Sequence, residues 1–175
     1  MKIRSVIHTL SLFALLLCAC INDKPDEGSQ VSVGDTLPQF TVTLNNGSIV
    51  SDTSLRGQHA LIVFFHTSCS DCQHELPVIQ QFFEAQQQCR VVCISREQET
   101  ESVEAYWQQH NLTMPFSAQS TREVYSLFAA SHIPQIFLVS PQGIIIRHWT
   151  DADMPTLETL LAAMSEDIDH PVVNM

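Results

Sequence analysis

The chain has 175 residues and a formal net charge of −11 at neutral pH. Such an acidic chain should repel nucleic acid and anionic membrane surfaces, which excludes functions that need a basic surface. Its length suits one domain with a substantial core, and the four cysteines after residue 20 are too few for a disulfide framework.

The N-terminus has the features of an export signal. Its apolar run, residues 6–17, is too short to span a bilayer but suits a signal core. Cys20, preceded by Ala19, resembles the lipidated cysteine of a bacterial lipobox, and the alternative is an ordinary signal that ends near Ala19. We expect residues 1–19 to be a lipoprotein signal peptide. The protein would then be lipid-anchored through Cys20 in the cell envelope and face the periplasm or the cell exterior, where disulfides persist.

Three further segments follow in the predicted organisation. Residues 20–32 are polar and acidic with a proline and a glycine, so we expect the lipid anchor and a flexible tether. Residues 33–164 form the predicted folded domain, and residues 165–175 an acidic C-terminal tail.

The domain begins with alternating residues 39–44, an Asn-Asn-Gly turn and a returning segment at 48–50, which together predict a β-hairpin. Residues 61–65 are apolar on both faces, as in a central strand that helices cover on both sides. Apolar residues at helical spacing predict a helix over 75–88.

The remaining elements complete an α/β fold. A buried strand at 90–95 should run parallel to 61–65 through a right-handed crossover. The other predicted elements are helices at 100–110, 122–130 and 154–164, and strands at 136–139 and 144–149 joined by a tight turn. This order predicts a mixed central sheet with helices on both faces and an added N-terminal hairpin.

Cys69 and Cys72 lie between the first buried strand and its helix, in the motif Cys-Ser-Asp-Cys. Such a pair can be a metal clip, a structural staple or a reactive dithiol. At the amino end of a helix, unpaired N–H groups and the helix dipole favour a thiolate, so Cys69 is the candidate nucleophile. Cys72 lies one turn later on the same helix face, where it can resolve a mixed disulfide.

These features resemble the extracytoplasmic TlpA/ResA-like thiol–disulfide oxidoreductases, a thioredoxin-fold branch of the AhpC/TSA superfamily. The resemblance implies a thioredoxin-like three-layer sandwich and a protein-disulfide reductase with no cofactor besides a redox-active Cys69–Cys72 disulfide. It also implies protein dithiol or disulfide substrates, a transmembrane electron donor and a monomer. The segments that carry it are Val33–Phe40, Leu55–Gly57, Phe64–Pro77, Ile133–Val139 and Pro141–Gly143.

The resemblance assigns roles to two further positions. Pro134 should be cis and pack against the disulfide, so that backbone at Ile133 and Pro134 can pair with substrate; the alternative is a trans proline that opens a strand. Glu75, three residues after Cys72, should exchange protons with the resolving thiol, unless it is a surface glutamate.

Several positions depart from related patterns. Thioredoxins proper have a buried aspartate where this chain has Val63, and the common tryptophan before the first cysteine is Ser68. Peroxiredoxin chemistry uses a proline and a threonine where this chain has Ile62 and His66, so the sequence does not favour peroxide reduction.

Two other functions stay open at this stage. His132 could join Cys69 and Cys72 in a three-ligand set for Cu(I) or Zn(II), as in a metal carrier. The fold could also serve as a non-catalytic binding scaffold. Cys89 and Cys93 lie about 13 Å apart if both are on one strand, too far to pair, and we expect buried inert thiols.

The direction of electron flow depends on Asp71. Its negative charge between the two sulfurs disfavours the thiolate and hence the reduced form. We therefore expect a reductant, with a potential nearer about −270 mV than about −120 mV.

Overall fold

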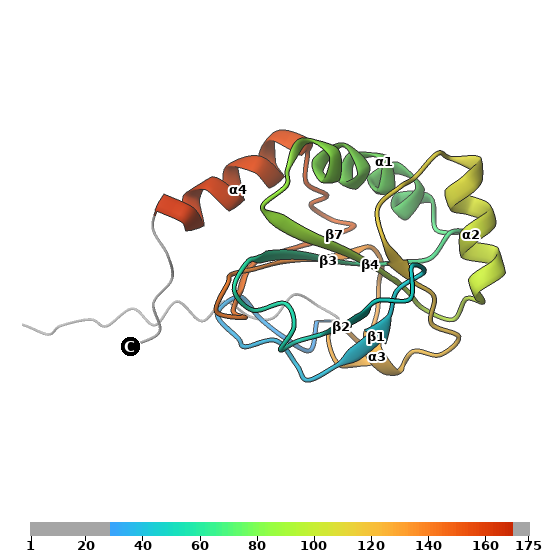
Figure 1. The fold of residues 1–175 in the computed structure, drawn as a ribbon, viewed down its shortest axis with the longest axis horizontal. Coiled ribbons are helices and arrows are strands. Elements are labelled where there is room, and N and C mark those ends of the chain that lie inside the picture. Colours follow the sequence, from blue (N-terminus) through green and yellow to red (C-terminus); the bar gives the residue numbers. More distant parts are fainter. Residues whose placement is uncertain (1–28, 170–175) are drawn as a thin grey trace, which may run out of the picture.

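The computed structural model describes residues 29–169, whose centre is a five-stranded mixed sheet in the order β5-β4-β3-β6-β7 (Figure 1). β3, β4 and β5 are parallel, β6 is antiparallel to β3, and β7 is antiparallel to β6. The strands are β3 (His59–Phe65), β4 (Cys89–Ser95), β5 (Phe116–Ser117), β6 (Gln135–Val139) and β7 (Ile145–Thr150).

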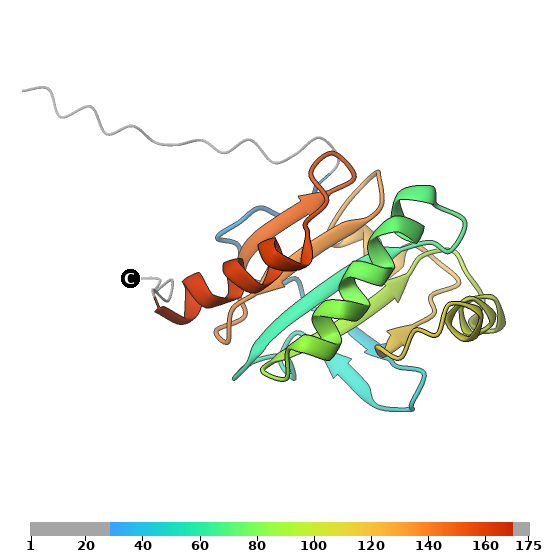
Figure 2. The same ribbon diagram turned by 90° about the horizontal axis from the view of Figure 1, so that it is seen from above.

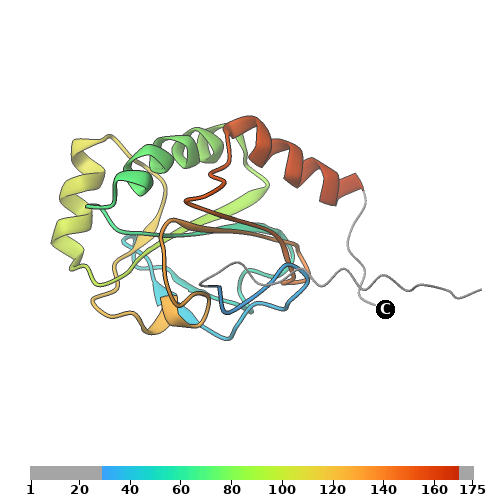
Figure 3. The ribbon, with the colours of Figure 1, turned by 180° about the vertical axis from the view of Figure 1, so that it is seen from behind.

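The expected hairpin is present as β1 (Thr41–Thr43) and β2 (Ile49–Ser51), an antiparallel pair outside the main sheet. It covers one face together with α3 (Glu123–Ser126), and α1 (Ser70–Ala85) and α4 (Leu157–Asp169) cover the other (Figures 1 and 3). Seen from above, α1 and α4 lie side by side, and they contact each other (Figure 2). The predicted three-layer fold is confirmed.

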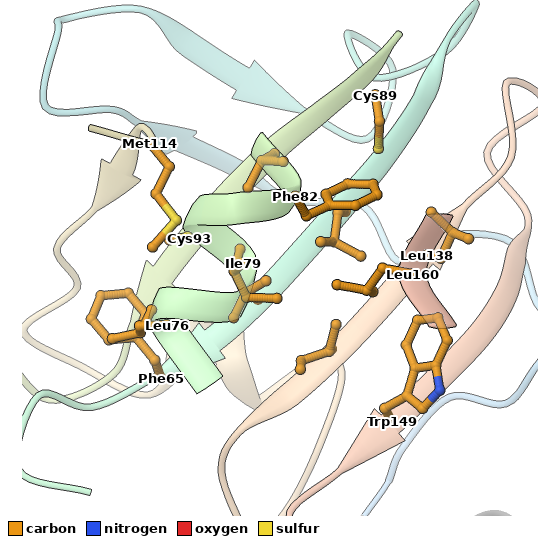
Figure 4. Packing of buried hydrophobic residues seen from close by; sticks show 14 of the residues in the cluster. Phe65, Leu76, Ile79, Phe82, Cys89, Cys93, Met114, Leu138, Trp149 and Leu160 are labelled. Atoms are coloured by element: carbon orange, nitrogen blue, oxygen red, sulfur yellow. The ribbon is translucent and has the colours of Figure 1, made fainter. Parts of the chain in front are cut away.

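The position of β3 explains why its sequence is apolar from Ala60 to Phe65. Leu61, Val63 and Phe65 face a core shared with α1, α4 and α2 (Thr100–Gln109), whereas Ile62 and Phe64 face the core under the hairpin and α3. Figure 4 shows the first of these cores, where side chains of α1 pack over β3, β4 and β6. Burial of each large apolar side chain stabilises the fold by roughly 1.5–3 kcal/mol, so these two cores anchor the strand that carries the dithiol turn.

Two predicted boundaries at the domain's ends were wrong. Residues 29–32 were assigned to the tether, but Val31 is buried, and the N–H of Gln30 donates to the carbonyl of Phe128 at 2.8 Å. The predicted helix at 122–130 is also shorter: α3 ends at Ser126, and Ala129 forms an isolated antiparallel bridge with Ser29.

The C-terminal helix is longer than predicted. α4 continues to Asp169, so residues 165–169 are helical and not part of a tail. A contact between Asp167 and the start of β3 holds this last turn: Oδ2 of Asp167 lies 2.8 Å from Nε2 of His59, and both side chains are buried.

Other expected features lie outside the described residues: the signal peptide at 1–19, the lipidation site Cys20, and the tail beyond residue 169. Within residues 29–169, no helix is long and apolar enough to cross a bilayer.

Candidate active site

The candidate nucleophile Cys69 caps the amino end of α1. A turn follows β3, closed by the N–H of Cys69 donating to the carbonyl of His66 at 3.0 Å. Cys69 has an extended backbone, and its sulfur accepts a hydrogen bond from the N–H of Cys72 at 3.3 Å. A sulfur at a helix N-cap receives a donor that the helix itself leaves unpaired, which stabilises negative charge on it.

Cys72 is fully buried, whereas Cys69 is partly exposed. Burial, together with the hydrogen bond to Cys69, raises the pKa of the Cys72 thiol well above its ordinary range. No disulfide joins the two cysteines in this structure. A partner disulfide can reach only the first sulfur directly, and the second needs help to lose its proton.

Glu75 follows Cys72 by one turn of α1 and is only 3 % exposed. The alternative of a surface glutamate is therefore excluded. Its Oε1 is buried and has no hydrogen-bond partner among residues 29–169. Burial raises the pKa of this carboxyl to about 7, so near neutral pH it can both accept and release a proton.

A second loop meets the dithiol from β6. The Ile133–Pro134 peptide bond is cis, as the resemblance implied, and Pro134 is buried. The thiol of Cys69 contacts the carbonyl oxygen of Ile133 at 3.5 Å, which brings the two halves of the predicted site together although 64 residues separate them.

The proposed metal set is not assembled. The side chain of His132 lies toward Asp151, with Nδ1 3.9 Å from Oδ2. No group of three or more histidine, cysteine, aspartate or glutamate side chains within the described part of the chain is arranged to hold a metal ion. The geometry thus does not support the carrier.

Cys89 and Cys93 are buried on β4 and unpaired (Figure 4). Burial raises the pKa of Cys89 to about 12 and raises that of Cys93 as well. Thiols that stay protonated inside a core are poor nucleophiles, in agreement with the inert role expected for them.

Two neighbours of the site were not predicted. Tyr125 of α3 donates from its hydroxyl to the carbonyl of His132 at 2.6 Å, and the guanidinium groups of Arg96 and Arg122 lie 4.6 and 5.3 Å from its ring centroid. Gln98 is hydrogen-bonded to the turn before Cys69. The contact between Gln98 and the turn spans 31 residues, and no local motif signals either contact.

Solved structures share this fold, and named relatives match most of the chain. The thioredoxin domain of a thiol-disulfide oxidoreductase from Bacteroides vulgatus has a TM-score of 0.64 at 20% identity, with 77% of this chain and 99% of that chain covered. StoA from Bacillus subtilis has a TM-score of 0.61 at 25% identity, with 74% and 98% covered. Thiol-disulfide oxidoreductase ResA of Bacillus subtilis is 21% identical over 180 residues, with 99% of this chain and 94% of ResA covered.

The fold, the dithiol and these relatives define a thioredoxin-fold thiol–disulfide oxidoreductase of the TlpA/ResA-like type. The chain belongs to the AhpC/TSA family, which matches residues 33–148.

Proposed function

We propose that this oxidoreductase reduces disulfides of extracytoplasmic proteins through its Cys69–Cys72 dithiol, while anchored to a membrane by a lipid on Cys20. The observation that carries the proposal is the asymmetry of the two thiols on α1, one accessible and capped by a backbone N–H, the other buried. An attacking thiol and a resolving thiol need these two different environments.

The exchange has two steps. The thiolate of Cys69 attacks one sulfur of the substrate disulfide, a mixed disulfide forms, and the other substrate sulfur leaves and takes up a proton. Glu75 accepts the proton of Cys72, whose sulfur then attacks that of Cys69 and releases the second substrate thiol. The substrate disulfide gains two electrons, and the protein is left with a Cys69–Cys72 disulfide.

Substrate placement follows from the second loop. The carbonyl of Ile133 contacts the accessible sulfur of Cys69, and an extended substrate segment would pair with the backbone of Ile133 and Pro134 beside it. The oxidised protein must then be reduced again. We assign this role to a membrane-embedded dithiol donor, because the compartment expected for an exported protein is oxidising.

Trapping of mixed disulfides tests the exchange. Cys72→Ala should accumulate substrate proteins bound through Cys69 in cells, because the resolving thiol is absent. Cys69→Ala should capture none, and Cys89→Ala serves as a matched control for loss of a buried thiol. A Cys72→Ala protein that captures no more partners than Cys69→Ala would contradict the proposal.

The lipid anchor has a separate test. Radiolabelled fatty acid should be incorporated into the wild-type protein and into Cys18→Ser, but not into Cys20→Ser. Incorporation that persists in Cys20→Ser would show that the anchor is wrongly placed and would leave the dithiol chemistry untouched.

A further inference from the structure

All three polar backbone and side-chain groups of Thr67, two residues before Cys69, are hydrogen-bonded. Its N–H donates to Oε1 of Gln98 at 2.8 Å, and its hydroxyl accepts from Nε2 of Gln98 at 2.6 Å. Its carbonyl accepts from Nε2 of Gln73 at 2.7 Å. The carboxamide of Gln98 is thus hydrogen-bonded to both the backbone and the side chain of Thr67.

Gln98 itself is firmly held. It is buried in the segment after β4, and its N–H donates to the carbonyl of Gln119 at 2.9 Å. The preceding Glu97 has φ of 55°, a left-handed conformation that residues other than glycine seldom adopt. Such outliers persist where the surroundings over-determine the backbone, and they gather at functional sites.

We propose that Gln98 is a positioning residue for the dithiol, fixing Thr67 and thereby the turn that presents Cys69 at the amino end of α1. The inference rests on the proposed exchange function. The contact that depends on this placement is the hydrogen bond from the N–H of Cys72 to the sulfur of Cys69. Hydrogen bonds weaken steeply with distance and angle, so a small displacement of the turn removes much of this one.

The position of Gln98 separates it from the other partner of Thr67. Gln73 is exposed on α1, where water competes for the same carbonyl, whereas Gln98 is shielded from solvent. Loss of the buried carboxamide leaves two polar groups of Thr67 without their partners, which costs more than loss of an exposed hydrogen bond.

The test compares the rate at which iodoacetamide alkylates Cys69 in the reduced full-length protein at neutral pH. Gln98→Met keeps the length of the side chain and removes both of its hydrogen bonds to Thr67. The alkylation rate of Cys69 and the rate of disulfide exchange should therefore each fall about tenfold. Thr67→Val removes only the hydroxyl and should cause a smaller fall. Both changes remove the hydrogen bond between the Gln98 side chain and the Thr67 hydroxyl. Their effects in the double variant should therefore be less than additive.

Gln81→Met, at an exposed position of α1, controls for the substitution itself and should leave the alkylation rate unchanged. A purely structural role for Gln98 would lower the unfolding midpoint and leave Cys69 reactivity in the folded protein unaltered.

A folded Gln98→Met protein with wild-type alkylation and exchange rates would overturn the inference. If Gln98→Met does not fold, Thr67→Val decides, and an unchanged Cys69 rate there would overturn it as well. Failure of the wild-type protein to exchange disulfides would instead count against the proposed function, since the alkylation rates can still be compared.

Discussion

The sulfur of Cys69 accepts a hydrogen bond from the N–H of Cys72 at 3.3 Å, across the first turn of α1. The two residues share this contact, but only the first is open to solvent. Position at the helix N-cap and access together support the assignment of attack to Cys69 and of resolution to Cys72.

Alkylation of the reduced protein at neutral pH should therefore label Cys69 at least about tenfold faster than any other thiol of the domain. Burial raises the pKa of Cys72, Cys89 and Cys93, and it also keeps the reagent away from them. Peptide mass spectrometry after short labelling times measures the four rates. Equal labelling rates for Cys69 and Cys72 would contradict the assignment of Cys69 as the attacking thiol.

Glu75→Gln should slow disulfide exchange by about a hundredfold where resolution by Cys72 limits the rate, because the amide cannot accept a proton. The pH–rate profile should also lose the inflection near 7 that the raised pKa of this carboxyl produces. Glu84→Gln, an exposed glutamate of the same helix, is the matched control. A Glu75→Gln profile that superimposes on the wild-type profile would rule out proton transfer by Glu75.

The same carboxyl makes stability depend on pH. Burial raises the pKa of Glu75 from 4.5 to about 7, so between these values the folded state binds more protons than the unfolded state. Its contribution is fully present below pH 4.5 and is lost as pH rises through 7.

Relative to Glu75→Gln, the wild-type protein should lose roughly 3 kcal/mol of unfolding free energy across that window. Urea unfolding of both proteins at several pH values measures the difference. Parallel stability curves would show that the carboxyl titrates normally.

Asp71 is half-buried in the first turn of α1. Burial chiefly, then the hydrogen bond to Cys69 and more weakly the charge of Asp71, raise the pKa of the Cys72 thiol. A negative charge beside the dithiol makes a thiolate less stable, and so removes the thiolate stabilisation that favours the reduced form in strongly oxidising relatives of this fold. We expect a reduction potential near the thioredoxin value of about −270 mV, and a less negative one in Asp71→Asn. Equilibration with glutathione measures both. A wild-type value above about −180 mV, or no change in the variant, would refute the charge argument.

The buried contact between His59 and Asp167 lies at the start of β3, the opposite end of the strand from the dithiol turn. Asp167→Ala leaves the imidazole without this partner and should lower the unfolding free energy by about 1–3 kcal/mol. The exchange rate of the folded protein should not change. Thermal unfolding against Glu158→Ala, an exposed acid on α4, isolates the effect, and slower exchange in Asp167→Ala would contradict it.

The parts of the site that local pattern encodes were predictable. The run Leu61–Phe65 is apolar on both faces, which predicted a central strand, and the spacing of Cys69 and Cys72 behind it predicted a dithiol at a helix start. The cis bond at Pro134 came from the resemblance alone, because no periodicity distinguishes a cis proline from one that opens a strand.

Contacts between distant segments were not predictable from one sequence. Gln98 lies in a loop without a motif, and its hydrogen bonds to Thr67 span 31 residues. Asp167 is a second case. The acidic residues around it predict a solvated tail, but in the folded protein its side chain is buried against His59. Both residues are buried by segments that are distant in the sequence, and local sequence patterns predict helices and strands but not how these pack together.

In the proposed reaction, the Cys69–Cys72 dithiol is oxidised to a disulfide while the substrate's disulfide is reduced to two thiols. The most direct test mixes the reduced full-length protein with a peptide disulfide and maps every cysteine by mass spectrometry. We predict a Cys69–Cys72 disulfide, two new thiols on the peptide, and Cys89 and Cys93 unchanged. Reduction of the peptide by Cys69→Ser at the wild-type rate, or a product without the Cys69–Cys72 bond, would contradict the claim.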